Sequence, residues 1–342
     1  MTGIDVRFLS DGGQAPAEVA TEIVRFIAAT RRSLDIAIYD FNAREGAAAA
    51  VADALEAASA RGVSVRVVFN QERVEYPDVR RPPISDPEEI DGLMVPTRGV
   101  RGNGALMHHK YVVRDGEEVL TGSTNWTDDA FSREENVILR LASPELARAY
   151  TDNFSQMWER EKVEASGGRG PLVTLDRTAV QPSFSPKGPS IAHLVAEFLG
   201  EAQRRVRILT PVLTSGPILG TLAELSGRAR FDLAGAYDRT QMEEVGAQWA
   251  VVPANAWKIH AWNAVAPRLS GKRSTPYSKT SVHDYMHAKA IVVDDEVLTG
   301  SYNCSRGGTE NAENVVRIKD NGIADRFAAF VDEVTARYRA VP

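Results

Sequence analysis

The chain has a single cysteine, Cys304, among 342 residues, which excludes an internal disulfide and fits a reducing compartment such as the cytoplasm. It has no run of about 18 apolar residues, so no membrane-spanning helix is predicted. The N-terminus lacks a basic stretch followed by an apolar one, and we expect no secretory signal peptide. Basic residues do not predominate, since 40 Lys and Arg stand against 46 Asp and Glu, for a net charge of −6. This balance is not typical of a strongly basic nucleic-acid-binding protein, although a local basic groove is compatible with it.

Two segments of the chain carry the same motif. The first reads MHHKYVVRDGEEVLTGSTN at 107–125, and the second reads MHAKAIVVDDEVLTGSYN at 286–303. Both fit His-x-Lys-x4-Asp followed by Gly-Ser-x-Asn, and both are trailed by Glu-Asn-Val, at 135–137 and 313–315. This number of matching positions in one order is very unlikely by chance. The repeated motif therefore predicts an internal duplication.

Strands and helices are expected to alternate in the same order in each half, which is typical of a sheet covered by helices. In the first half, the predicted strands are 5–10, 33–39 and 63–69, and the predicted helices are 16–30 and 46–61. In the second half, the predicted helices are 191–205 and 218–228, and the predicted strands are 206–213 and 231–237. Each motif then predicts two strands joined by a short turn, a third strand, and a closing helix, at 144–159 or 323–340. The segment 164–171 has the turn residues of a linker, so we place the two domains at 1–165 and 171–342.

Two long stretches, 70–106 and 238–285, precede the motifs without a regular pattern. Such irregular segments are usually functional loops, and we expect both to frame the mouth of a site. The second holds Trp249, Trp257 and Trp262. These side chains suit either a lipid-facing rim or packing within the loop itself.

The histidines and lysines of the motifs suit chemistry on a phosphodiester. On a strand, residues two apart face the same side, so His108 and Lys110 point together, as do His287 and Lys289. Lysine ammonium groups can neutralise the charge of the phosphate without a metal. One imidazole can act as a nucleophile, and a second, protonated, can give its proton to the leaving oxygen.

The other motif residues can support this centre. Neutral donors to the phosphate oxygens are expected from Ser123, Asn125, Ser301 and Asn303. Glu135 and Glu313 are candidates to accept a ring N–H and so fix the tautomer of a histidine.

The double motif resembles that of the phospholipase D superfamily, whose defining pattern is the same His-x-Lys-x4-Asp with Gly-Ser-x-Asn. The resemblance implies an α/β fold of two similar α/β/α sandwich halves, related by a pseudo-twofold axis, with the active site at their interface. It also implies a phosphoric diester hydrolase that works in two steps through a phosphohistidine, without a metal or other cofactor. By the same resemblance, His108 is the nucleophile and His287 the acid. The implied phosphate cradle comprises Lys110, Lys289, Ser123, Ser301, Asn125 and Asn303, with Asp115 and Asp294 as structural supports and Glu135 and Glu313 behind the histidines.

Three classes of function stay open. A phospholipid-cleaving or phospholipid-transferring enzyme, with a peripheral membrane contact, is favoured by the loop-rich mouths, the tryptophans and the acidic net charge. A nuclease acting on DNA or RNA is the alternative, because Asn-Ala-Glu-Asn-Val-Val at 311–316 is similar to the small bacterial nucleases of the superfamily. The mixed charges of 70–106 do not predict a nucleic-acid track. A non-catalytic scaffold is the third class. Because one chain holds both motifs, we expect a monomer.

Two structural readings compete with a catalytic site. One copy of the motif alone could be a buried strand with a hydrogen-bonded histidine, but its repetition argues against this. The residues His283, Asp284 and His287 have a spacing compatible with metal ligands. Lys289 beside them would repel a cation, so no metal site is predicted.

Overall fold

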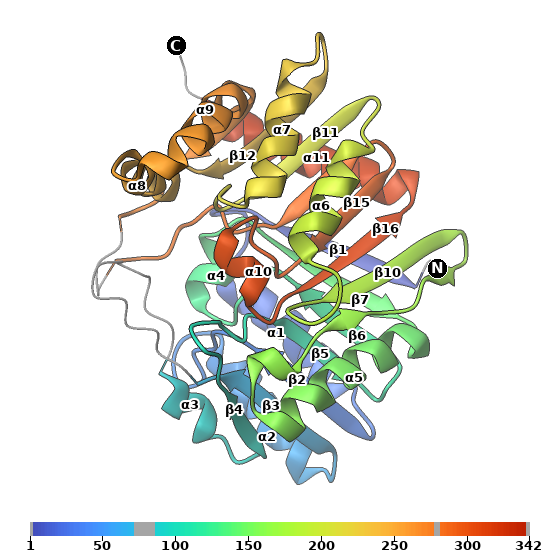
Figure 1. The fold of residues 1–342 in the computed structure, drawn as a ribbon. Helices are drawn as coiled ribbons and strands as arrows, with labels where there is room; N and C mark the ends of the chain where they lie inside the picture. Colours follow the sequence, from blue (N-terminus) through green and yellow to red (C-terminus); the bar gives the residue numbers. More distant parts are fainter. Residues whose placement is uncertain (1–2, 72–85, 277–280, 340–342) are drawn as a thin grey trace.

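The structure is a computed structural model that describes residues 3–71, 86–276 and 281–339 (Figure 1). Two β-sheets form its frame, one from each half of the chain. The first sheet contains β1 (Ile4–Leu9), β2 (Ser33–Ile38), β3 (Ser64–Asn70), β4 (Thr97–Val100), β5 (Lys110–Arg114), β6 (Glu118–Gly122) and β7 (Asn136–Ala142). The second contains β8 (Gly168–Arg169), β9 (Val173–Leu175), β10 (Thr178–Phe184), β11 (Arg205–Thr210), β12 (Asp232–Asp238), β13 (Leu269–Lys272), β14 (Ala290–Val293), β15 (Glu296–Gly300) and β16 (Asn314–Lys319).

The two sheets have the same strand order. The first runs β1-β7-β6-β5-β2-β3-β4, and the second runs β10-β16-β15-β14-β11-β12-β13, with the short strands β8 and β9 beside β10. In each sheet the last three strands pair in parallel. The motif strands pair antiparallel with each other and with the strand that follows. The duplicated motif therefore belongs to a duplicated fold, which confirms the predicted α/β architecture of two similar halves.

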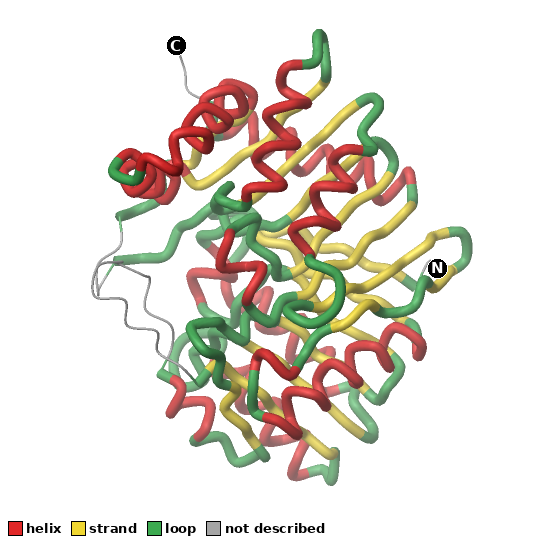
Figure 2. The backbone as a smooth tube through the Cα atoms, in the orientation of Figure 1, coloured by secondary structure: helices red, strands yellow, loops and turns green. Residues whose placement is uncertain are grey.

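Helices cover both faces of each sheet (Figure 2). They are α1 (Pro16–Ala28), α2 (Ala49–Ala60) and α5 (Pro144–Arg160) in the first half, and α6 (Ile191–Gly200), α7 (Gly216–Gly227) and α11 (Asn321–Arg337) in the second. Alternate residues of a strand face opposite sides of its sheet. Accordingly, Val112 of β5 packs in a cluster with α1 and α2, whereas Tyr111 and Val113 pack in another with α5. In β14, Ile291 packs with α6 and α7, and Val292 with α11, so both halves are α/β/α layers.

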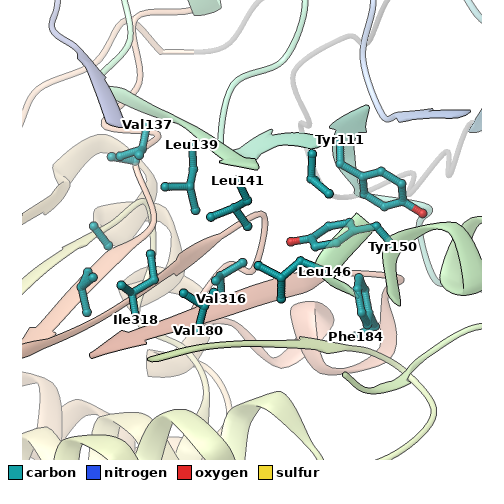
Figure 3. Close-up of a cluster of buried hydrophobic side chains, with 14 of the residues drawn as sticks. Tyr111, Val137, Leu139, Leu141, Leu146, Tyr150, Val180, Phe184, Val316 and Ile318 are labelled. Atoms are coloured by element: carbon teal, nitrogen blue, oxygen red, sulfur yellow. The ribbon is translucent and has the colours of Figure 1, made fainter. Parts of the chain in front are cut away.

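One apolar cluster joins the two halves (Figure 3). It includes Leu139 of β7 and Ile318 of β16, which lie on the sides of the sheets that face each other. The rings of Tyr111 and Tyr150 meet edge to face at 5.0 Å, and Tyr150 meets Phe184 of the second half at 4.9 Å. Because the side chains of this shared interior are buried and in contact, they fix the position of one half against the other.

The second long stretch is not the irregular loop that we expected. It forms α8 (Arg239–Ala250), α9 (Ala256–Val265) and the edge strand β13. Trp249 is buried, Trp262 packs edge-on against Tyr237 at 4.8 Å, and Trp257 is 49% exposed. The residues of α9 carry no helical signal because the apolar ones surround the helix instead of following one face. Two of the three tryptophans therefore pack within the protein.

Short elements complete the fold. They are α3 (Pro87–Asp91) before β4, α4 (Asp128–Ser132) after the first motif, and α10 (Arg306–Glu310) after the second. The predicted linker, 164–171, begins in the short 3-10 turn Val163–Ala165 that follows α5, and it contains β8. Residues 72–85, which hold half of the charged residues of the first long stretch, lie outside the described residues. Within the described ranges, no helix is long and apolar enough to cross a membrane.

Candidate active site

The two motif segments meet at the interface between the halves. His108 lies just before β5, and His287 lies just before β14, each in an extended segment that pairs with the opposite half. The two bridges join Met107 with Ala312 and Met286 with Glu135. Each half therefore supplies a histidine to a centre whose opposite wall comes from the other half.

Glu313 holds the ring of His108. Its Oε2 lies 2.9 Å from Nδ1 of His108 and accepts a second hydrogen bond, of 2.7 Å, from the hydroxyl of Ser301. A carboxylate at Nδ1 keeps the ring proton there and leaves the Nε2 lone pair free. Burial, and then the positive charges of Lys110 and Lys289, lowers the pKa of His108 well below its usual value. The unliganded ring is therefore neutral, as a nucleophile must be.

His287 is held in a different way. Its Nδ1 lies 3.1 Å from Oδ1 of Asn136 and 3.3 Å from Oε2 of Glu134. Asn136 accepts a hydrogen bond of 2.7 Å from the hydroxyl of Ser123 and donates one of 3.0 Å to Glu134. Burial, followed by the charge of Lys289, lowers the pKa of His287 well below its usual value. Neither Asn136 nor Glu134 was predicted to lie at the site.

Glu135, which we expected behind a histidine, takes part instead in a buried ion pair between the halves. Its Oε2 lies 3.0 Å from Nζ of Lys272. Its Oε1 accepts hydrogen bonds from the hydroxyl of Tyr338 and, at 3.4 Å, from the backbone N–H of Asp11. The side chains of Lys272 and Glu135 are 3% and 0% exposed. The expected role of Glu135 is therefore corrected, and Asn136 with Glu134 takes its place.

A one-residue difference in strand register explains this correction. The backbone N–H of Ser123 donates to the carbonyl of Val137, whereas that of Ser301 donates to the carbonyl of Asn314. Ser123 thus pairs one residue further along its chain segment than Ser301 does, and Asn136 occupies the place of Glu313. The repeated letters Glu-Asn-Val align Glu135 with Glu313 and hide the shift. Each glutamate stands twelve residues after its serine, so only the pairing of the strands reveals the shift.

Two buried lysines stand beside the histidines. Nζ of Lys110 donates to the carbonyl of His108 at 2.8 Å, and Nζ of Lys289 donates to the carbonyl of His287 at 2.6 Å. Burial lowers the pKa of Lys110 to about 7, although the charge of Glu313 opposes the change. Burial, and then the charge of Lys110, lowers the pKa of Lys289. Two ammonium groups that repel each other in a buried centre favour the binding of an anion.

Tyr39 and the two motif amides complete the centre. The ring of Tyr39 lies 4.6 Å from that of His108, and Nζ of Lys110 lies 4.6 Å from the centroid of the Tyr39 ring. Nothing in the sequence marked Tyr39, which follows β2 far from either motif. In the described part of the chain, the side-chain oxygens of Asn125 and Asn303 are buried without a hydrogen-bond partner. Such atoms are uncommon in folded proteins, so both amides are suited to meet a ligand.

The residues of the alternative metal site have other contacts. The carboxylate of Asp284 accepts hydrogen bonds from the backbone N–H of Thr275 at 2.7 Å and from its hydroxyl at 2.9 Å. The backbone N–H of His283 donates to Asp129 at 2.8 Å. Among residues 3–71, 86–276 and 281–339, no three His, Cys, Asp or Glu side chains are grouped to hold a metal ion.

Asp115 and Asp294 lie at the turns of the motif hairpins, in the left-handed backbone conformation with φ of 57° and 51°. The carboxylate of Asp115 accepts hydrogen bonds from three consecutive backbone N–H groups, at 31–33. That of Asp294 accepts from those at 203–205. Each aspartate thereby ties its hairpin to the start of the neighbouring strand, β2 or β11. These contacts fit a supporting role away from the reacting atoms.

The change Asp115→Asn is expected to lower the free energy of unfolding by about 2 kcal/mol at neutral pH, because three charge-assisted hydrogen bonds are weakened. Asparagine tolerates the left-handed backbone, so the effect reports the charge. Although partial burial opposes it, the hydrogen bonds lower the pKa of Asp115. The stabilisation is therefore present at neutral pH and is lost as the pH falls through this lowered pKa. Urea unfolding of both proteins at several pH values measures the difference, and equal stability at neutral pH would refute the supporting role.

Comparison with known proteins gives relatives over both halves. The family described as "Cardiolipin synthase, PLD-like domain" matches residues 23–158 and 195–335. The mitochondrial cardiolipin hydrolase of Xenopus laevis is 32% identical over 129 residues, which make up 38% of this chain and 56% of that protein. The human mitochondrial cardiolipin hydrolase is 28% identical over 140 residues, 41% of this chain and 51% of that protein. The chain thus spans little more than half the length of these relatives.

A solved structure shares the whole fold. The phosphatidylserine synthase of Haemophilus influenzae Rd KW20 aligns with a TM-score of 0.65 over 98% of this chain and 86% of that one, at 14% sequence identity. At this identity the likeness concerns the fold alone. Both motif segments fall inside the stretches that the family matches, and both halves repeat one architecture. The chain therefore belongs to the phospholipase D-like family.

Proposed function

We propose that the protein is a phosphodiesterase that cleaves its substrate through a phosphohistidine. One observation carries the proposal: a buried and a partly buried imidazole, one from each half, have their Nδ1 atoms held by acceptors and stand beside two buried lysines. This arrangement leaves both Nε2 atoms for reaction with an anion that the ammonium groups attract.

In the first step, Nε2 of His108 attacks the phosphorus atom. An N–P bond forms as the P–O bond to the leaving alcohol breaks, and the leaving oxygen takes a proton from Nε2 of His287. Lys110 and Lys289 offset the negative charge that builds on the phosphoryl oxygens in the transition state. Glu313 offsets the positive charge that the ring of His108 acquires.

In the second step, His287 acts as a base. Its Nε2, now without the proton, accepts one from water while the water oxygen attacks the phosphorus. The N–P bond breaks, and its electron pair returns to His108. An alcohol in place of water would give transfer of the phosphoryl group instead of hydrolysis, by the same movement of atoms.

We infer a phospholipid as the substrate class. The curated relatives are named for cardiolipin, and the family model is described by cardiolipin synthase. An exposed apolar corner between α8 and α9 supports a peripheral membrane contact, since Val251, Val252 and Trp257 are 80%, 44% and 49% exposed. Nζ of Lys258 lies 5.9 Å from the Trp257 ring, and this pairing suits an anionic lipid surface. We further propose that the chain acts as a monomer, in the cytoplasm.

A side-by-side assay in EDTA tests the proposal. The purified protein is given vesicles of phosphatidylcholine or phosphatidylglycerol, single-stranded DNA, and bis(4-nitrophenyl) phosphate, with His108→Asn as the blank. We expect release of lipid head group and of nitrophenol at rates that EDTA does not change, because lysines neutralise the phosphate. Cleavage of DNA without lipid turnover would establish the nuclease alternative. Loss of activity in EDTA would overturn the metal-free mechanism, and inactivity on all substrates would favour a scaffold.

A further inference from the structure

The two histidines face the same pair of residue types in exchanged positions. The side chain that accepts a hydrogen bond from the motif serine hydroxyl is Glu313 in the second half and Asn136 in the first. Two residues earlier in the chain stand Asn311 and Glu134, respectively. The side-chain amide of Asn311 donates to Glu313 at 3.4 Å, as that of Asn136 donates to Glu134 at 3.0 Å. The acid and the amide have therefore changed places between the halves.

Glu313 both orients the ring of His108 and offsets its charge. Around His287 these two roles fall to different residues. An amide oxygen at Nδ1 orients the ring, but it bears no full charge. A histidine that gives up a proton must first hold it, and the resulting imidazolium needs a negative neighbour in a buried centre. Glu134 is 3% exposed and lies 3.3 Å from Nδ1 of His287. It is thus placed to supply the charge that Asn136 lacks.

Positive charges around His287 increase the need of its protonated ring for a negative neighbour. Four neighbouring groups bear or can acquire positive charge and disfavour a proton on His287: Lys289, Lys110, His108 and His283. The groups whose charges act on Glu134 are Lys289, Lys272 and Asp40. Burial raises the pKa of Glu134 to about 8 and lowers that of His287, so each group favours its neutral form unless the other one is charged. A proton on His287 is therefore stabilised by the Glu134 carboxylate, 3.3 Å from its Nδ1.

Building on the proposed function, we propose that Glu134 is the positioning residue that enables His287 to act as the acid, while Asn136 only orients the ring. In the first step the proton leaves Nε2 of His287 for the leaving oxygen, and Glu134 offsets the charge of the ring until it does. In the second step the same carboxylate favours return of a proton from water. Glu134 touches neither the phosphorus nor the leaving group, so its effect must depend on how much the leaving group needs a proton.

Substrates whose leaving groups differ in their need for a proton test the role of Glu134. Nitrophenolate departs without protonation, whereas the alkoxides of phosphatidylglycerol and of DNA require it. For Glu134→Gln we expect turnover of the alkyl diester that the wild-type protein cleaves to fall by about 100-fold, the usual contribution of general acid catalysis. The burst of nitrophenol from bis(4-nitrophenyl) phosphate, which reports the first step, is expected to change by less than about threefold, because that step then needs no acid.

Two further variants serve as controls. The double variant Glu134→Asn with Asn136→Glu copies the second half, and we expect it to restore most of the alkyl-diester turnover that Glu134→Gln loses. Glu135→Gln makes the same chemical change in the adjacent residue, whose carboxylate contacts Lys272. It is expected to lower the melting temperature but to leave the ratio of the two rates unchanged.

The outcomes separate this inference from the proposed function. If the wild-type protein cleaves no diester, the proposed function fails, and the role of Glu134 fails with it. If the wild-type protein is active but Glu134→Gln slows both leaving groups equally, or slows neither, the function stands and the role of Glu134 is refuted. A slow alkyl reaction that the double variant does not restore would also refute it, because the exchange would then not be equivalent.

Discussion

His108→Asn and His287→Asn are each expected to reduce turnover of an alkyl phosphodiester by about 10⁴-fold or more, and the double variant to be little worse than either. The reason is that each histidine performs a step that the other cannot complete. His108 forms the bond to phosphorus, and His287 moves the proton. Residues that act as one unit are strongly non-additive, so the second loss has little left to remove. Steady-state rates on the substrate that the wild-type protein cleaves give the measurement.

His109 offers a matched control for the histidine variants. It is fully buried, its ring lies 5.1 Å from that of Tyr111, and its Nδ1 lies 3.3 Å from Oδ1 of Asn314. We place it in the core and not at the reacting atoms, so His109→Asn is expected to lower stability with a far smaller loss of turnover. Equal losses of turnover in His109→Asn and His108→Asn would argue that packing, and not chemistry, accounts for the effect.

Lys110→Met and Lys289→Met are each expected to reduce turnover by about 10²–10³-fold, the range measured when one group that stabilises transition-state charge is removed. Stability is expected to respond in the opposite sense. Methionine keeps much of the volume, and its introduction removes a buried charge that repels the other lysine. We therefore expect each variant to be at least as stable as the wild-type protein. Thermal unfolding and steady-state rates on the same preparations measure both effects.

The pH dependence follows from the same lysines. Only the ammonium form of Lys110 attracts the phosphate, and burial lowers its pKa to about 7. The value of kcat/KM is therefore expected to fall as the pH rises through about 7. Because an unfolded lysine stays charged to higher pH, the folded state binds fewer protons above this value and its stability rises in the same interval. An exposed lysine, Lys319, is a control, since Lys319→Met should leave the profile unchanged. A profile that keeps rising above pH 8 would contradict the proposed role of Lys110.

The sequence alone predicted the halves and most of the centre because the motif occurs twice with nearly constant spacing. A repeated His-x-Lys-x4-Asp and Gly-Ser-x-Asn fixes two strands and their turn in each half, and the same strand order then follows. It could not place the residue behind His287. The identity of that residue depends on how β7 pairs with β6, the strand that leads into Ser123. A shift of one residue in this pairing changes which side chain faces His287.

Other misses have physical causes of their own. Tyr39 reaches the centre only because β2 pairs with β5, so its ring lies beside His108 although the two are far apart in sequence. The local sequence does not predict helix α9 because packing on α7, and not an amphipathic pattern, stabilises it. In both cases tertiary contacts decide what the local sequence leaves open.

The most direct test of the account is to trap the covalent intermediate. The wild-type protein and the two histidine variants are mixed with bis(4-nitrophenyl) phosphate, quenched within one turnover, and mapped by mass spectrometry under conditions that preserve phosphohistidine. We expect a phosphoryl adduct on His108 in the wild-type protein, its accumulation in His287→Asn, and none in His108→Asn. An adduct on His287 that persists in His108→Asn would reverse the two roles. Nitrophenol release with no adduct in any protein would contradict the phosphohistidine mechanism itself.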